Sequence, residues 1–193
     1  MLGQREIWDI LKSVEAVREG HFRYTSGLHG KVYVQCALLL KEPLLAAKVC
    51  AGLAERFRED RPEAVVGPAV GAVNLSYEVA RQLGITSLFT ERGDDGKMTL
   101  RRAFEIKPGQ RVLVVEDVIT TGGTTQEAVD VMTALGAQVV GAGSIVDRSG
   151  GKAKLTVPYF SLLQLEAEHY DPAQCPLCAA NIPIEKPGSR KPR

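Results

Sequence analysis

The sequence lacks an excess of charge, a membrane-length apolar run and an export signal. Its 193 residues carry 24 Lys and Arg against 23 Asp and Glu, so no overall field attracts nucleic acid or an anionic membrane. No apolar run approaches the ~20 residues of a membrane span, and the N-terminus lacks the basic and then apolar pattern of a secretory signal. We therefore expect a cytoplasmic protein with no nucleic-acid or membrane partner.

Cysteine is also scarce, with four residues in the chain. Cys36 and Cys50 stand alone among apolar residues, which is typical of buried thiols in a reducing compartment. Cys175 and Cys178 form a single CxxC, a weak sign of zinc because a tetrahedral site needs two more ligands. His169 is near in sequence, and a second CxxC could come from a dimer partner. A structural turn or a redox-inert pair explains the motif more simply, so we assign no metal-ligating residue.

What the chain does contain is an alternation of helical and strand-like segments. Periodicity predicts helices at 4–18, 43–58, about 72–83 and 126–135. It predicts strands at 64–66, 85–90, 111–117, 137–146 and 155–165, the last interrupted by Pro158 and so placed at an edge or bend. Such alternation with short connections predicts an α/β fold with a parallel sheet and right-handed crossovers.

The stretch 111–125 carries the clearest chemistry. Its apolar, β-branched start is typical of a strand buried on both faces. Glu116 and Asp117 end this predicted strand, where carboxylates are costly to bury unless a ligand uses them. A hydroxyl-rich loop and a helix N-terminus follow, which together attract phosphate. Carboxylates also accept hydrogen bonds from vicinal ribose hydroxyls, so the stretch predicts a site for a phosphorylated sugar. Its predicted binding residues are Val118, Ile119, Thr120, Thr121, Gly122, Gly123, Thr124 and Thr125.

Two other phosphate motifs are excluded. No lysine follows the glycines at the spacing of a Walker loop, and Gly141-Ala142-Gly143 lacks the third glycine of a dinucleotide fingerprint. A plain strand-to-helix connector would also contain glycine, but the adjacent acidic pair favours a binding site.

Residues 114–122, Val-Val-Glu-Asp-Val-Ile-Thr-Thr-Gly, resemble the phosphoribosyl-pyrophosphate signature of type I phosphoribosyltransferases. The resemblance covers roughly residues 21–150. It implies one domain over 1–193, with an N-terminal hood segment at 1–40, an α/β core at 60–165 and a C-terminal tail at 166–193. It also implies a mobile flap and Mg²⁺ bound mainly through phosphoribosyl pyrophosphate, with Asp117 and Glu116 as catalytic residues.

A second glycine-flanked turn follows the strand at 64–66. It is either a tight turn only or a second loop whose N–H groups face a ligand, and the resemblance favours the family's pyrophosphate loop. The residues assigned to this loop are Gly67, Pro68, Ala69, Val70 and Gly71.

Residues 91–102 read as a charged hairpin with an Asp-Gly turn. A solvated charged face is the simpler interpretation. The resemblance implies a flap that neutralises leaving-group charge and often reaches the neighbouring subunit's site, with Lys97 and Arg92 as candidates. The sequence of residues 91–102 departs from the family's usual flap motif, Arg-Lys-x-x-Lys-x-His-Gly.

Two features resemble the orotate class within this family. Residues 21–35 alternate like two strands joined by a glycine turn and resemble its substrate-covering segment, with Thr25 where a lysine often stands and Lys31 or Arg23 as candidates for the missing charge. Arg148 follows the strand at 137–146 and could fork onto a planar carboxylate, although a surface ion pair with Asp147 is the alternative. Thr25, Tyr33 and Arg148 are therefore predicted to bind orotate.

The resulting hypothesis is an orotate phosphoribosyltransferase of pyrimidine biosynthesis, acting on orotate and phosphoribosyl pyrophosphate as a homodimer with shared active sites. The alternatives are a purine-base phosphoribosyltransferase and a non-catalytic, nucleotide-sensing regulator of the same fold.

Overall fold

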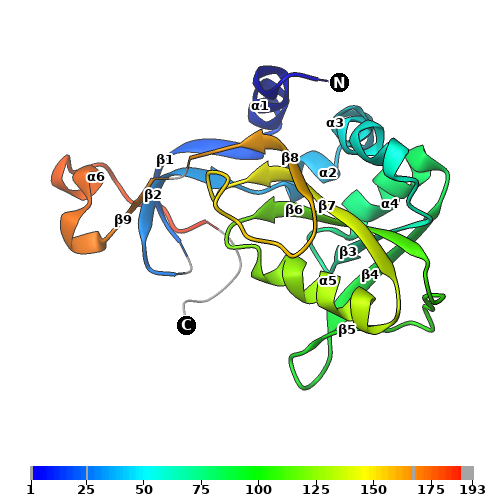
Figure 1. The fold of residues 1–193 in the computed structure, drawn as a ribbon. Coiled ribbons are helices and arrows are strands. Elements are labelled where there is room, and N and C mark those ends of the chain that lie inside the picture. The colour runs from blue at the N-terminus through cyan, green and yellow to red at the C-terminus, as the bar shows by residue number, and fades with distance from the viewer. Residues whose placement is uncertain (1, 25, 167, 188–193) are drawn as a thin grey trace.

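Two β-sheets of unequal size organise the chain (Figure 1). The structure is a computed structural model that describes residues 2–24, 26–166 and 168–187. The large sheet has the strand order β5-β4-β3-β6-β7-β8, and the small sheet has the order β1-β2-β9.

The strands of the large sheet are β3 (Ala64–Pro68), β4 (Thr86–Arg92), β5 (Met98–Leu100), β6 (Arg111–Ile119), β7 (Gln138–Asp147) and β8 (Tyr159–Gln164). Those of the small sheet are β1 (Val17–Arg23), β2 (His29–Val34) and β9 (His169–Tyr170). The helices are α1 (Gln4–Ser13), α2 (Ala37–Leu40), α3 (Pro43–Phe57), α4 (Val73–Leu83), α5 (Gly123–Ala134) and α6 (Pro176–Ala179), with short 3₁₀ turns η1 (Arg58–Asp60) and η2 (Pro172–Gln174).

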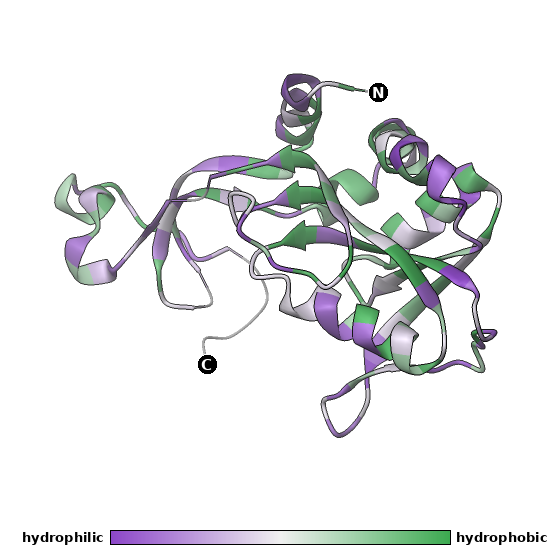
Figure 2. Ribbon diagram, in the orientation of Figure 1, coloured by the Kyte–Doolittle hydropathy of each residue, from purple (hydrophilic) through white to green (hydrophobic). Residues whose placement is uncertain are grey.

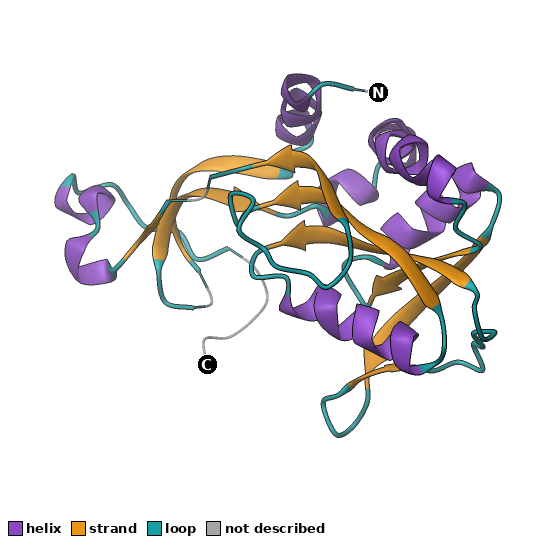
Figure 3. Cartoon of the chain, in the orientation of Figure 1, coloured by secondary structure: helices purple, strands orange, loops and turns teal. Residues whose placement is uncertain are grey.

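The central strand β6 is apolar on both faces because helices cover both. Leu113 and Val115 belong to a core cluster with residues of α3 and α4, whereas Val112 and Val114 belong to a second cluster with residues of α5. Successive strand residues point to opposite faces, so a continuous apolar run is what this position requires. Figure 2 shows the apolar character of β6 and β7 in green, and Figure 3 shows the helices on either side.

The prediction of a parallel sheet is confirmed. In the large sheet, β4, β3, β6, β7 and β8 run parallel to one another, and β5 pairs with β4 in the antiparallel direction. Strand β8 is an edge strand that begins directly after Pro158. The arrowheads of β6 and β7 point toward the small sheet (Figure 1), so the loops at their carboxyl ends face it.

Several predicted boundaries were wrong: β8 begins at residue 159 rather than 155, and α5 at residue 123 rather than 126. The first helix ends at Ser13 rather than residue 18, because Glu15 adopts a left-handed φ of 56° and Val17 already starts β1. Strand β6 continues to Ile119, since it pairs with β7 as far as the register Ile119↔Asp147. Glu116 and Asp117, predicted to end the strand, are therefore followed in it by Val118 and Ile119.

The C-terminal tail adds a strand that periodicity did not predict. Tyr170 pairs with His29 and His169 with Gly30, which places β9 on the small sheet. Farther along, Glu185 exchanges main-chain hydrogen bonds with His21 and Arg23. Among the helices that the structure describes, none has the length and apolar character needed to cross a membrane.

Candidate active site

The acidic pair near the end of β6 is largely buried. Glu116 is 7% exposed, and Asp117 accepts a hydrogen bond from the Val118 N–H at 2.8 Å. Burial, reinforced by the neighbouring Asp117 charge, raises the pKa of Glu116 to about 9. Burial also raises the pKa of Asp117. The pair therefore retains a proton near neutral pH, a state in which one group donates and the other accepts hydrogen bonds.

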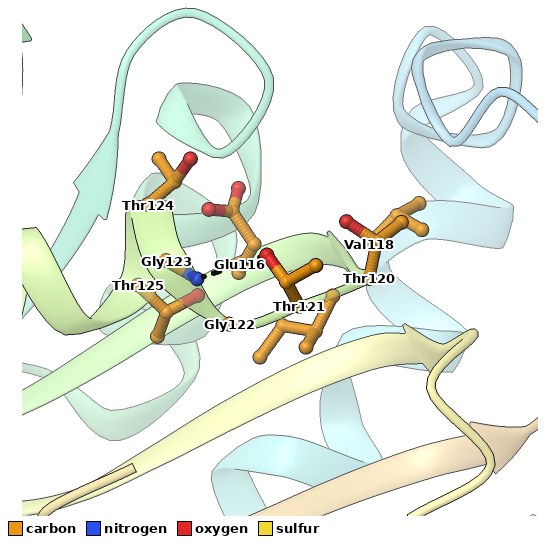
Figure 4. Close-up of a pocket in the computed structure, with 9 residues that line it drawn as sticks. Glu116, Val118, Thr120, Thr121, Gly122, Gly123, Thr124 and Thr125 are labelled. Atoms are coloured by element: carbon orange, nitrogen blue, oxygen red, sulfur yellow. Dashed lines mark hydrogen bonds between the residues drawn. The ribbon is translucent and has the colours of Figure 1, made fainter. Parts of the chain in front are cut away.

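The loop between β6 and α5 surrounds a polar cavity of about 50 Å³ lined by Glu116 and residues 118–125. A single water needs only ~10–15 Å³ by this kind of measure, so the cavity has room for a small anion. The Thr121 hydroxyl accepts a hydrogen bond from the Gly123 N–H at 3.4 Å (Figure 4). Gly122 has a φ of 86°, which a glycine adopts without strain. The loop thus turns directly into the N-terminus of α5, whose partial positive charge faces this cavity.

The second predicted loop lies against the acidic pair. A Cβ built on Gly71 would stand 3.0 and 3.1 Å from the two carboxylate oxygens of Asp117. A Cβ on Gly67 would stand 2.5 Å from the Ala72 carbonyl oxygen. The peptide bond between Ala69 and Val70 is cis, and the Val70 side chain is 86% exposed. The structure therefore brings the loops after β3 and in β6–α5 together at one edge of the sheet, as the sequence predicted.

The two flap candidates, Arg92 and Lys97, form no hydrogen bond or ion pair with Glu116 or Asp117 in the part of the chain that the structure describes. The hairpin of β4 and β5 projects from the body of the molecule (Figure 1). Arg92 binds Glu127 of α5 at 2.6 Å and the Gly96 carbonyl at 2.7 Å. The Lys97 side chain is exposed and forms no hydrogen bond or ion pair within the described ranges. Of the two candidates, Lys97 is thus the one whose ammonium group is available.

Arg148 lies beside the small sheet, under an aromatic ring that sequence reasoning missed. Its guanidinium carbon is 4.6 Å from the centroid of the Tyr24 ring, and its Nε is buried without a hydrogen-bond partner among the described residues. Asp147 is fully buried and accepts from the Ser149 N–H at 2.6 Å, so no exposed Asp147–Arg148 ion pair forms. Tyr24 follows Phe22 in the alternation of the hairpin, which is the signal that could have identified it.

The other hairpin candidates have different surroundings. Tyr33 donates to the Gln35 side chain at 2.8 Å, and the Arg148 charge acts to lower its pKa against the larger effect of burial, which raises it. Lys31 binds Glu168 at 2.7 Å, so its charge is neutralised by the tail. Thr25 lies outside the described residues, and its predicted role stays a prediction.

Comparison with known proteins decides the family. A model of the phosphoribosyl transferase domain matches residues 39–174. The chain belongs to the phosphoribosyltransferase family.

Named relatives of this phosphoribosyltransferase match it over almost its whole length. An orotate phosphoribosyltransferase of Desulforamulus reducens is 52% identical over 190 residues, covering 98% of this chain and 99% of the relative. One of Caldicellulosiruptor bescii is 51% identical, covering 94% and 95%. The crystal structure of orotate phosphoribosyltransferase from Aeropyrum pernix superposes with a TM-score of 0.70 at 27% identity, covering 82% of this chain and 93% of that one.

The raised pKa of Glu116 has a consequence for stability that a Glu116→Gln variant tests. In the unfolded chain the carboxyl loses its proton near the ordinary glutamate pKa of 4.5, whereas in the folded protein it keeps the proton to about 9. The stability of the neutral form is therefore complete below the lower value and is lost as the pH rises toward the upper one. We expect Glu116→Gln to match the wild type at pH 4.5 and to be more stable by about 1–3 kcal/mol at pH 8.5.

Chemical denaturation at both pH values measures this difference, and Glu105→Gln, at an exposed acid, is the control. An offset between Glu116→Gln and the wild type that does not change with pH would contradict the assignment of a buried, protonated pair.

Proposed function

We propose that this chain is an orotate phosphoribosyltransferase. It transfers the 5-phosphoribosyl group from phosphoribosyl pyrophosphate to orotate, giving orotidine 5′-monophosphate and pyrophosphate, in de novo UMP biosynthesis. Identity near 50% with full-length relatives of that name supports the reaction. The observation that carries the choice of base is Arg148, whose Nε is buried with no hydrogen-bond partner among the described residues. Its main-chain N–H donates to the carbonyl of Ile119 at 2.8 Å, beside the phosphate loop. The four cysteines of the chain form no disulfide, which fits the cytoplasm, a reducing compartment.

The loop of residues 118–125 holds the 5′-phosphate. Its exposed threonine hydroxyls and N–H groups line the cavity at the start of α5, where a helix N-terminus favours an anion. The buried acidic pair next to it binds the ribose 2′- and 3′-hydroxyls, with the ionised carboxylate accepting and the protonated one able to donate. The sugar is thereby fixed at both its phosphate and its diol, which orients C1 for attack.

Loss of pyrophosphate leaves positive charge on the ribose ring. The single negative charge that the Asp117–Glu116 pair carries while it keeps one proton stabilises that charge in a buried setting where electrostatic interactions are strong. Carboxylate oxygens are also suitable ligands for Mg²⁺. The ion would be bound mainly through phosphoribosyl pyrophosphate and would neutralise charge on the leaving group. The N–H groups of Val70 and Gly71 donate to the pyrophosphate, since Pro68 has no N–H and the Ala69 N–H already donates to the Thr90 carbonyl at 2.6 Å. The close approach of Gly71 to Asp117 supports a position for this loop beside the same sugar.

The flap completes the site from a second copy of the chain in a homodimer. Lys97 is free to neutralise the pyrophosphate, whereas Arg92 is held by Glu127 of its own chain. Val70 and Tyr77 are 86% and 64% exposed, and apolar side chains this exposed beside the pyrophosphate loop favour a covered interface.

A mixing experiment tests this shared site. Asp117→Asn and Lys97→Ala should each lower kcat by at least ~100-fold with little change in Tm, because each removes a charge that acts on the reacting groups. If the flap crosses between subunits, a mixed dimer has one intact site. Random re-association of the two variants should then restore roughly a quarter of wild-type activity. No restoration after verified subunit exchange would place the flap in its own subunit's site.

The base site lies between Arg148 and the hairpin. The planar guanidinium can hold the orotate carboxylate in a bidentate arrangement, with Tyr24 stacked on its face and Tyr33 and Thr25 from the same hairpin covering the base. Arg148→Lys keeps the charge but loses the fork. We expect the KM for orotate to rise ~10–100-fold, equivalent to about 1.4–2.8 kcal/mol, while the KM for phosphoribosyl pyrophosphate changes little.

Steady-state kinetics with each substrate varied in turn measures this separation, with the exposed Arg5→Lys in α1 as control. Equal changes in both KM values would contradict a role for Arg148 in selecting the base.

The proposed reaction itself is tested by a base panel. Purified protein is incubated with phosphoribosyl pyrophosphate, Mg²⁺ and either orotate, adenine, guanine or xanthine, and pyrophosphate release is followed. Orotate should exceed every purine by at least ~100-fold in kcat/KM, because a purine has no carboxylate to pair with the buried Nε of Arg148. A faster purine would instead indicate a purine-base enzyme, and no release with any base would indicate a regulator.

A further inference from the structure

Four metal-binding side chains converge at the small sheet, away from the acidic pair. They are His21 of β1, His29 of β2, and Cys175 and Cys178 at the ends of a CxxC around the start of α6. One ligand atom from each lies within 4.8 Å of all the others. Three of the four residues are buried, and Cys178 is exposed. In Figure 1, α6 and β9 lie at the far end of the small sheet from α3 and α4.

The distances within the cluster match a tetrahedron. Zn–N bonds of about 2.0–2.1 Å and Zn–S bonds of about 2.3 Å separate ligand atoms by roughly 3.3 Å for N–N and 3.6 Å for N–S pairs. Here Nε2 of His21 is 3.1 Å from Nδ1 of His29. The Cys175 and Cys178 sulfurs are 3.6 and 3.7 Å from His21 Nε2, and the Cys178 sulfur is 3.4 Å from His29 Nδ1.

A contact outside the cluster sets the lone pair of His21. Its Nδ1 lies 2.8 Å from the Ile182 carbonyl oxygen, which can only accept, so Nδ1 carries the proton and Nε2 presents a lone pair to the cluster. Metal-binding histidines commonly donate their other N–H to a carbonyl in this way, which fixes ring orientation and tautomer. The tail thus contributes both two sulfurs and the carbonyl that orients an imidazole.

The tail has no hydrophobic core to hold it in place. Among the described residues from Glu166 to Pro187, Cys175 alone is buried, and Ile182 and Ile184 are 42% and 46% exposed. Surface contacts such as the Arg18–Glu185 ion pair, whose side chains are 41% and 56% exposed, stabilise little. A small unit of this kind ordinarily needs a metal or disulfides to fold.

We propose that His21, His29, Cys175 and Cys178 bind one Zn²⁺ ion that fastens the C-terminal tail to the β1–β2 hairpin. A closed set of two thiolates and two imidazoles in tetrahedral geometry selects zinc and leaves no open position for catalysis. His169, the ligand suggested by proximity in sequence, instead packs edge-on against Tyr24 with ring centroids 5.4 Å apart. No second CxxC from a partner chain is needed. The site does not depend on the proposed function.

Metal analysis of the full-length protein, purified without a metal-affinity step, tests the proposal. We expect about one zinc per chain and at least a tenfold loss in the Cys175→Ser, Cys178→Ser double variant. Cys50→Ala removes a buried thiol elsewhere, and His169→Gln removes the neighbouring histidine, so both should keep the zinc. Wild-type protein reconstituted with Co²⁺ should show tetrahedral ligand-field bands and a sulfur-to-cobalt charge-transfer band, a readout that requires no variant to fold.

Removal of zinc with a chelator should raise amide hydrogen exchange in residues 169–185 and in β1 and β2 while leaving β6 protected. Three results would overturn the proposal. The first is retention of less than about a tenth of a zinc ion per chain after incubation with one equivalent of zinc and desalting. The cluster would then be a hydrogen-bonded pair of histidines and not a metal site. The second is a Cys175–Cys178 disulfide in protein purified without oxidant. The third is a cobalt spectrum without sulfur ligation.

Discussion

The burial of two adjacent carboxylates at the end of an apolar central strand is the constraint on which the rest of the site depends. Strand β6 can be apolar on both faces because α5 covers one and α3 and α4 the other. The same cover reduces hydration of Glu116 and Asp117, raising the pKa of each. An acid pair so placed lowers stability in the absence of ligand. Under the proposed function, a cationic transition state would offset that cost and binding energy would be directed toward the state with positive charge on the sugar.

Glycine makes that constraint compatible with a second loop. Gly71 approaches the Asp117 carboxylate so closely that a methyl group there would force the carboxylate to shift by a few tenths of an ångström. In the proposed complex, the loop after β3 and the acids of β6 can therefore contact the same sugar, although the two loops follow different strands. Parallel strands make this possible, since their carboxyl ends meet at one edge of the sheet.

Sequence reasoning found the large sheet because its elements obey local rules. The apolar runs of β3, β6 and β7, Pro43 at the first position of α3 and Gly84 after α4 all act within a few residues. It erred where tertiary pairing decides: β7 extends β6 by ladder hydrogen bonds through the acidic pair. Within the site, the acids and the loop after them were predicted from the residues themselves, the loop at 67–71 was assigned by resemblance, and Arg148 by its place after a strand together with the resemblance. Tyr24 was missed because its importance comes from stacking on a residue more than a hundred positions away.

The cluster of His21, His29, Cys175 and Cys178 could not be predicted from sequence motifs for a related reason. Zinc-site histidines usually stand three to five residues apart on one helix, whereas His21 and His29 come from opposite strands of a hairpin, near the register Arg23↔His29. That hairpin is anchored at its other end by Val17 and Val34, which are buried in the main core. Tyr24 leaves β1 just beyond the cluster and still covers Arg148. The hairpin is therefore held at both ends, and the position of the aromatic ring over the guanidinium follows from the core at one end and the cluster at the other.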